Sequence, residues 1–188
     1  PQRNTFNRIK DAIGNIFANS GGITEKSLSN VSEYFKQSLA KYQPNQIFTN
    51  DELDRPHKEQ KGMGNYSKVV LAQQNASPKR TKTAPSKAPN FTVNGFILAP
   101  GTGTVTDPTE TPIHNHSADC FSYVWKGNVT EVSFNKVENK TQENRYGTTT
   151  PKEYKIRRDG DANVRVPDEQ GKDTHAIMNF STEPAYLI

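Results

Sequence analysis

The stretch Thr111-Pro-Ile-His-Asn-His-Ser-Ala-Asp-Cys-Phe-Ser-Tyr-Val-Trp-Lys-Gly127 carries the strongest signal in the sequence. On an extended strand, residues two apart point to the same face, so His114 and His116 are expected to project side by side. Their imidazoles can then reach one metal ion. A His-x-His pair alone is weak evidence, because it arises by chance in many chains.

A third histidine strengthens this interpretation. The chain contains 4 histidines, and His175 lies in a second strand-like segment. Strands distant in sequence become neighbours across a barrel wall, so His175 can complete a three-histidine site. Three neutral imidazoles leave the full +2 charge on the ion and positions open for an anionic ligand such as a thiolate. The alternative is that all three are ordinary polar strand residues.

The spacing around these histidines resembles that of the cupin superfamily. The first cupin signature has His-x-His, then Glu and then Gly, and here Cys120 and Gly127 follow the histidine pair. The second signature is matched, with slightly longer spacing before the histidine, by Pro167, Gly171, His175 and Asn179. Cysteine in place of the cupin glutamate is similar to cysteine dioxygenase, whose motif reads Pro-Ile-His-Asp-His followed by Cys. The segment Asn179-Phe-Ser-Thr-Glu-Pro-Ala185 also resembles that family's sequence after its third histidine.

This resemblance implies a non-haem iron(II) thiol dioxygenase of cysteine metabolism. Fe(2+) would be held by His114, His116 and His175, and the small-molecule partners would be L-cysteine and O2. The product would be cysteine sulfinate. Cys120 would occupy the position that forms a thioether with a tyrosine in the family, although no partner tyrosine is identified here.

The substrate site departs from the family pattern. The family's Arg-Pro-Tyr-x-Arg stretch, which supplies an arginine for the substrate carboxylate, corresponds here to Arg55-Pro-His-Lys-Glu59. Glu59 would repel a carboxylate, so the candidate substrate-binding residues are His57 and Lys58, or Lys68 under a different alignment. Two alternatives therefore stay open. One is a cupin that holds another metal, and the other is a catalytically inactive cupin that serves as a binding or structural module.

The remaining sequence predicts a mainly β protein. After Asn90, short β-branched or aromatic runs alternate with Gly, Pro and Asn, which is typical of a small antiparallel barrel. The runs are residues 91–93, 96–98, 121–125, 129–134, 154–158, 163–166, 175–180 and 185–188. We therefore expect a cupin-type antiparallel β-barrel, or jelly roll, with two N-terminal helices packed outside it.

The helices are predicted from apolar residues at helical spacing. One set runs from Phe6 to Phe17 and the other from Leu28 to Tyr42. Residues 47–64 indicate turns and short extended pieces, and the Pro/Ser/Lys-rich residues 75–90 indicate a flexible loop. We expect a single cupin domain over residues 1–188, with the helices in 1–46 and the metal-binding barrel in 91–188.

Composition narrows the partners and the compartment. The net charge is +4, and the basic residues are spread along the chain rather than gathered as in a nucleic-acid-binding face. The single cysteine, Cys120, cannot form an intramolecular disulfide, which favours a reducing compartment. No stretch approaches the ~18 apolar residues of a membrane span. The expectation is a cytoplasmic monomer that binds neither nucleic acid nor a membrane.

Overall fold

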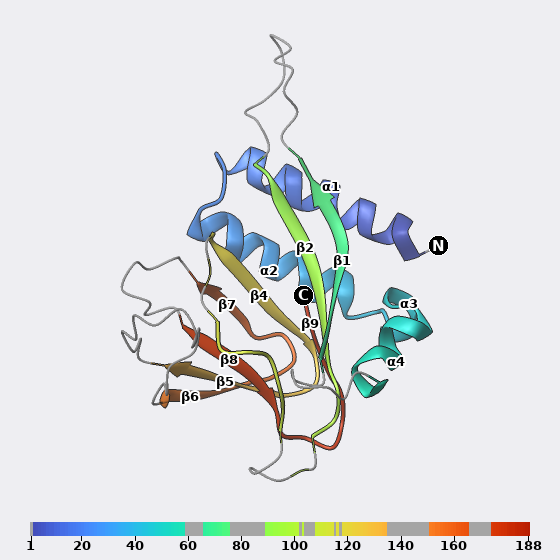
Figure 1. Cartoon of the computed structure of the whole chain (residues 1–188). Coiled ribbons are helices and arrows are strands. Elements are labelled where there is room, and N and C mark those ends of the chain that lie inside the picture. Colours follow the sequence, from blue (N-terminus) through green and yellow to red (C-terminus); the bar gives the residue numbers. More distant parts are fainter. Residues whose placement is uncertain are drawn as a thin grey trace.

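The computed structural model describes residues 2–58, 66–75, 89–101, 103, 108–114, 116, 118–134, 151–165 and 174–188. Within these residues four helices precede nine strands (Figure 1). The helices are α1 (Gln2–Asn19), α2 (Glu25–Leu39), α3 (Pro44–Ile47) and α4 (Asn50–Lys58). The strands are β1 (Tyr66–Gln74), β2 (Phe91–Leu98), β3 (Thr109–Glu110), β4 (Cys120–Lys126), β5 (Val129–Phe134), β6 (Pro151–Arg157), β7 (Ala162–Arg165), β8 (His175–Asn179) and β9 (Ala185–Leu187).

The strands form two antiparallel sheets. One sheet has five strands in the order β1-β2-β9-β4-β7, and the other has four in the order β3-β8-β5-β6. Apolar side chains from both sheets meet in the space between them, so the two sheets enclose one core. These side chains are Leu98, Val124, Val129, Ile177, Ala185 and Leu187. The expected mainly β fold with an antiparallel β-barrel is confirmed.

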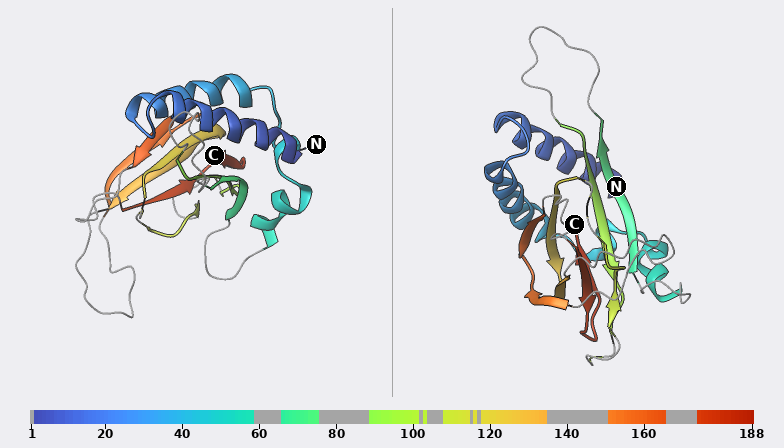
Figure 2. Two further views of the ribbon diagram at one scale, coloured as in Figure 1. Left: turned by 90° about the horizontal axis from the view of Figure 1, so that it is seen from above. Right: turned by 60° about the vertical axis from the view of Figure 1, so that its left-hand side comes forward.

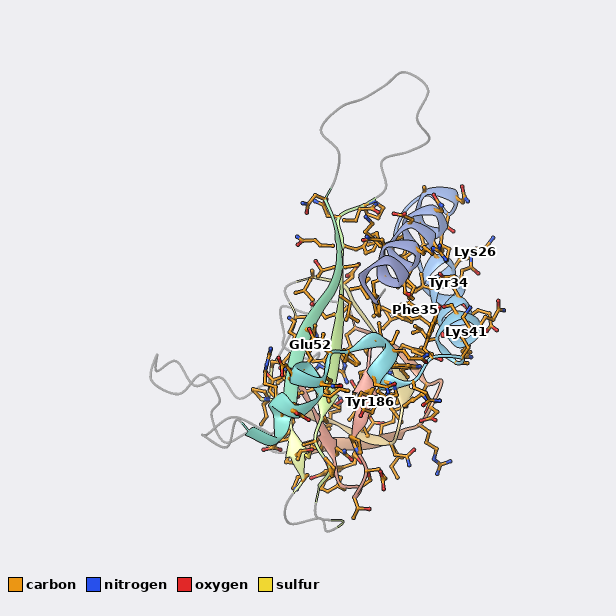
Figure 3. The ribbon with its side chains drawn as sticks, turned by 90° about the vertical axis from the view of Figure 1, so that its right-hand side faces the viewer. Lys26, Tyr34, Phe35, Lys41, Glu52 and Tyr186 are labelled. Carbon is orange, nitrogen blue, oxygen red and sulfur yellow. The ribbon has the colours of Figure 1, made fainter. Side chains whose placement is uncertain are left out.

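Helices α1 and α2 cover the outer face of the five-stranded sheet. Their apolar stripes are buried against Val93, Ile97, Tyr123 and Trp125. Figure 2 shows both helices lying along one side of the strands. In Figure 3, Phe35 lies on the side of α2 that faces the sheet. The prediction of two helices packed outside the barrel is therefore confirmed.

Local sequence signals explain where these two helices begin and end. Gly21 and Gly22 have φ angles of 74° and 119°, which glycine adopts without a steric penalty, and α1 ends just before them. Helix α2 begins after a capping box, in which Thr24 and Ser27 each accept a hydrogen bond from the other's backbone N–H. The indole nitrogen of Trp125 donates to the carbonyl oxygen of Leu39 at 3.0 Å, which ties the end of α2 to β4.

Two expectations about the middle of the chain are wrong. Residues 50–58 form helix α4 rather than turns. A capping box between Thr49 and Glu52 begins this helix, and that Thr-x-x-Glu pattern was visible in the sequence. The barrel also starts before residue 91, because β1 pairs with β2 along its whole length. Of the predicted loop 75–90, residues 76–88 lie outside the described residues.

The turn between β4 and β5 depends on one glycine of the first signature. Gly127 has a φ of 87°, in the left-handed region, and a Cβ at this position would lie 2.9 Å from the carbonyl oxygen of Pro184.

No described helix is both long and apolar enough to span a bilayer.

Candidate metal centre

Histidines 114 and 175 are held together by backbone hydrogen bonds. They form an isolated antiparallel bridge, with the N–H of each donating to the carbonyl oxygen of the other at 2.9 and 2.8 Å. His116 lies beyond this bridge and belongs to no strand. The expectation that His114 and His116 share one regular strand is therefore wrong. The backbone bridge between His114 and His175 nevertheless brings the histidine pair next to β8.

The three imidazoles converge on a common point. One ring nitrogen from each of His114, His116 and His175 lies within 4.8 Å of the others. The ring centroids are 4.6 Å apart for His114 and His175, 4.9 Å for His116 and His175, and 5.1 Å for His114 and His116. The predicted site residues are thus brought together from two separate segments.

The hydrogen bonds of two of these rings fit a metal ligand. The Nδ1 of His114 lies 2.8 Å from the carbonyl oxygen of Pro112, which can only accept, so this nitrogen carries the proton. Nδ1 of His175 lies 2.8 Å from a carboxylate oxygen of Glu131. The Nε2 of His175 is buried and has no hydrogen-bond partner among the described residues. A buried nitrogen in this state costs about 1–3 kcal/mol, which coordination to a cation would relieve.

Glu131 is a residue of the site that the sequence interpretation missed. Its side chain is 2% exposed, and three further side chains donate to it. They are Arg165 (Nε, 2.7 Å), Asn163 (Nδ2, 3.0 Å) and Arg157 (Nη1, 3.4 Å). The signal was an acidic residue in the middle of the strand Val-Thr-Glu-Val-Ser-Phe, between the apolar residues Val129 and Val132.

Burial and charge act in opposite directions on the pKa of Glu131. Burial raises it, but the hydrogen bond from His175 and the charges of Arg165 and Arg157 outweigh burial and lower the pKa to about 2. Burial also lowers the pKa of His175 to about 4, although the bond to Glu131 partly opposes this effect. Both groups are therefore in the form that suits a metal site, a carboxylate and a neutral imidazole.

The histidines line a cavity of about 1090 Å³, whose lining also includes residues of the strands and of helices α1 and α2. Polar and aromatic side chains from β1, β2, β4 and β7 also line this cavity: Tyr66, Lys68, Phe96, Cys120, Ser122 and Arg165. A volume of this size lies at the upper end of ordinary ligand sites. The metal candidates therefore face a space that a small molecule can enter.

Cys120 shares this cavity, as its place in the motif implies. It pairs across strands with Arg165. Burial raises the pKa of its thiol, against an opposing effect from Arg165, so the side chain is a neutral thiol. Tyr186 is turned away from Cys120, because its ring stacks on Phe48 at 6.1 Å within the helix-side cluster. It is not a partner for the cysteine.

The candidate substrate residues fall in two places. His57 and Lys58 are the last residues of α4, and their side chains lie outside the described residues, as does all of Glu59. Lys68 lines the cavity, with its Nζ 5.7 Å from the centroid of the Phe96 ring. Under the second alignment, the candidate cation is therefore a residue that lines the same cavity as the histidines.

The second signature is only partly described. Pro167 and Gly171 lie outside the described residues. Asn179 is buried and donates to the carbonyl oxygens of Ala99 and Glu183 at 3.0 and 2.8 Å. Its role is to hold the connection between β8 and β9.

Comparison with known proteins gives structural neighbours only. No protein-family model and no curated protein matches the chain. An oxalate oxidase in complex with the substrate analogue glycolate matches with 18% identity over 51% of this chain and 38% of its own length, at a TM-score of 0.33. Hydroxypropylphosphonic acid epoxidase from S. wedmorenis, in complex with fosfomycin, matches with 14% identity over 98% of this chain and 94% of its own, at a TM-score of 0.37.

A sugar phosphate isomerase of the cupin superfamily, from Silicibacter pomeroyi, matches with 16% identity over 73% of this chain and 59% of its own, at a TM-score of 0.35. Because these identities and TM-scores are low, the chemistry of the centre has to be derived from its own residues.

Proposed function

We propose that the protein is a metal-dependent oxidoreductase, and specifically a thiol dioxygenase that uses non-haem iron(II) to oxidise L-cysteine with O2 to cysteine sulfinate. The observation that carries the proposal is the group of three ring nitrogens within 4.8 Å, which contains no carboxylate. Three neutral ligands leave the whole charge of a divalent ion to attract an anionic substrate. A thiolate is such a substrate.

Iron(II) held by His114, His116 and His175 would supply the redox chemistry that places both atoms of O2 on the substrate sulfur. The protein's own contribution is binding and orientation. Lys68 supplies a positive charge on the cavity wall for the substrate carboxylate. Arg165 also lines the cavity, but its Nε is already bonded to Glu131 and its Nη2 to Ser133, at 2.7 and 3.2 Å.

The neutral Cys120 thiol leaves the charge of the site unchanged. Because burial raises the pKa of this thiol, the side chain adds no negative charge that would repel an incoming thiolate. Among the described residues that line the cavity, Lys68 and Arg165 are cations and Asp119 is an acid, so the lining carries a net positive charge. This balance favours a small anionic thiol over a cationic one.

The test is oxygen consumption by the iron-loaded protein. With L-cysteine we expect O2 uptake above that of free iron, with one sulfinate formed for each O2 consumed. Because Lys68 attracts a carboxylate, 3-mercaptopropionate should also be oxidised faster than cysteamine, which has none. His175→Ala is the matched control and should retain little iron. Uptake equal to that of free iron with all three thiols would overturn the proposal.

Metal analysis of the purified protein separates the remaining alternatives. Three histidines do not by themselves select iron. Stoichiometric zinc, nickel or manganese without thiol-dependent O2 uptake would indicate a cupin of different chemistry. A protein that binds no divalent metal would indicate a binding or structural module.

A further inference from the structure

We infer that Glu131 is a positioning residue for His175, and that it fixes the tautomer in which Nε2 is free to bind the metal. The inference rests on the proposed role of the three histidines as metal ligands. It concerns a residue of β5 that does not itself reach the metal. Nothing in the cupin-like signatures around residues 111–127 and 167–179 includes it.

The contact between the two side chains is short and buried. Nδ1 of His175 lies 2.8 Å from Oε1 of Glu131, and the two residues are 4% and 2% exposed. An ionised carboxylate only accepts hydrogen bonds, so the proton of the neutral imidazole must lie on Nδ1. The lone pair is then on Nε2, the buried nitrogen that has no other partner among the described residues. In metal sites such a carboxylate partner orients the ring and increases its basicity.

Two arginines keep Glu131 in the required form. Arg157 is 1% exposed and donates to Glu131 at 3.4 Å, while Arg165 donates to it at 2.7 Å. Two buried or half-buried positive charges against one carboxylate favour the ionised acid, because a neutral acid would leave both guanidinium groups uncompensated. The two arginines therefore hold Glu131 as the carboxylate that accepts the hydrogen bond from Nδ1 of His175.

Arg157 is itself held in place by further hydrogen bonds, so it restricts the position of the Glu131 carboxylate. The Nη1 of Arg157 donates to the hydroxyl of Ser122 at 2.9 Å, and its Nη2 donates to the carbonyl oxygens of Ser122 and Asp161 at 2.9 and 3.1 Å. Ser122 lies on β4 in the opposite sheet from Glu131. The orientation of a metal ligand on β8 thus depends on bonds that join the two sheets.

His114 provides an internal comparison. Its Nδ1 is also bonded, but to the backbone carbonyl of Pro112, which no side-chain substitution removes. Both rings should therefore show a proton on Nδ1 in the wild-type protein. Only the state of His175 should respond to a change at residue 131.

The wild-type test is nitrogen-15 NMR of the histidine side chains in the metal-free protein. We expect His114 and His175 to carry their protons on Nδ1, with assignment by His114→Gln and His175→Gln. A proton on Nε2 of His175 would overturn the inference. This measurement needs no metal and no activity, so it is independent of whether the protein oxidises thiols.

The variant test measures Co²⁺ affinity by competition with a chromophoric chelator. Glu131→Ala should weaken binding by about 10–100-fold. Glu131→Gln, whose amide oxygen can still accept from Nδ1, should lose less. The control Glu153→Gln removes an exposed carboxylate from the neighbouring strand β6 and should bind as wild type. Wild-type affinity in a folded Glu131→Ala variant would overturn the inference.

Loss of Glu131 leaves buried Arg157 without its counter-charge, so the single variants can unfold. The double variant Glu131→Gln with Arg157→Met removes both charges and preserves the acceptor oxygen. Circular dichroism verifies that each variant is folded before its affinity is compared. If the wild-type protein binds no Co²⁺ at all, the metal function fails, whereas the tautomer result still decides the role of Glu131.

Discussion

Replacing Arg157 with Met should destabilise the metal-free protein by about 3 kcal/mol, the lower end of the range for breaking a buried ion pair. Arg157 is 1% exposed and makes four hydrogen bonds, to Glu131, to Asp161 and to both the hydroxyl and the carbonyl oxygen of Ser122. The Met side chain fills most of the volume but removes all four of these hydrogen bonds. The cost stays at the lower end because Arg165 still compensates the charge of Glu131 at 2.7 Å.

The assay is urea unfolding followed by circular dichroism at pH 7, with the free energy of unfolding compared between variants. The matched control is Arg158→Met, which removes the same charge from the adjacent exposed position. It should change stability by no more than about 0.5 kcal/mol. If Arg157→Met lost less than about 1 kcal/mol, or no more than Arg158→Met, the buried ion cluster would not stabilise the barrel as argued.

Three further outcomes are expected. Gly127→Ala should lower the free energy of unfolding by about 1–3 kcal/mol, because its φ of 87° is strained for alanine and the new Cβ would lie 2.9 Å from the carbonyl oxygen of Pro184; a melt within error of wild type would contradict this. The metal-free protein should lose stability as the pH falls from about 6.5 to about 4. The pKa of His175 is lowered to about 4 in the folded state, so the unfolded chain binds this proton first and acid favours unfolding; urea midpoints that do not change between pH 7 and pH 5 would argue against it. Lys68→Met should raise KM for L-cysteine about tenfold, as expected for the loss of one charged contact worth about 1.4 kcal/mol. KM for cysteamine, which has no carboxylate, should stay unchanged. An equal effect on both thiols would show that Lys68 does not bind the carboxylate.

The spacing of apolar residues along the sequence was sufficient to predict most of the helices and strands. The stripes from Phe6 to Phe17 and from Leu28 to Leu39 repeat at helical spacing because one face of each helix packs on a sheet. The aromatic and β-branched runs after residue 90 appear as strands with boundaries close to those expected. The helix at residues 50–58 was missed because its few apolar residues hide its period, although the Thr49–Glu52 capping box marks its start.

Long-range pairing explains what local patterns could not show about the strands. Residues 66–74 contain only a short apolar run, because β1 is an edge strand with exposed positions along its length. Its place in the sheet follows from its pairing with β2. Residues 91–93 and 96–98 belong to one strand, because Gly95 and Asn94 between them continue the pairing with β1. Which strands pair depends on tertiary contacts, and these cannot be read from a single sequence.

By itself, the sequence determined the identity of the converging histidines, because few residue types bind metals and this chain holds only 4 histidines, three of them in strand-like segments. Only the tertiary structure decided what surrounds them. Glu131, Arg157 and Lys68 come from three different strands, β5, β6 and β1, and none of them stands beside a histidine in the chain. Folding the two sheets over one another places Glu131 against His175, Arg157 against Glu131, and Lys68 in the cavity wall that the histidines share. Charge acts through space rather than along the sequence.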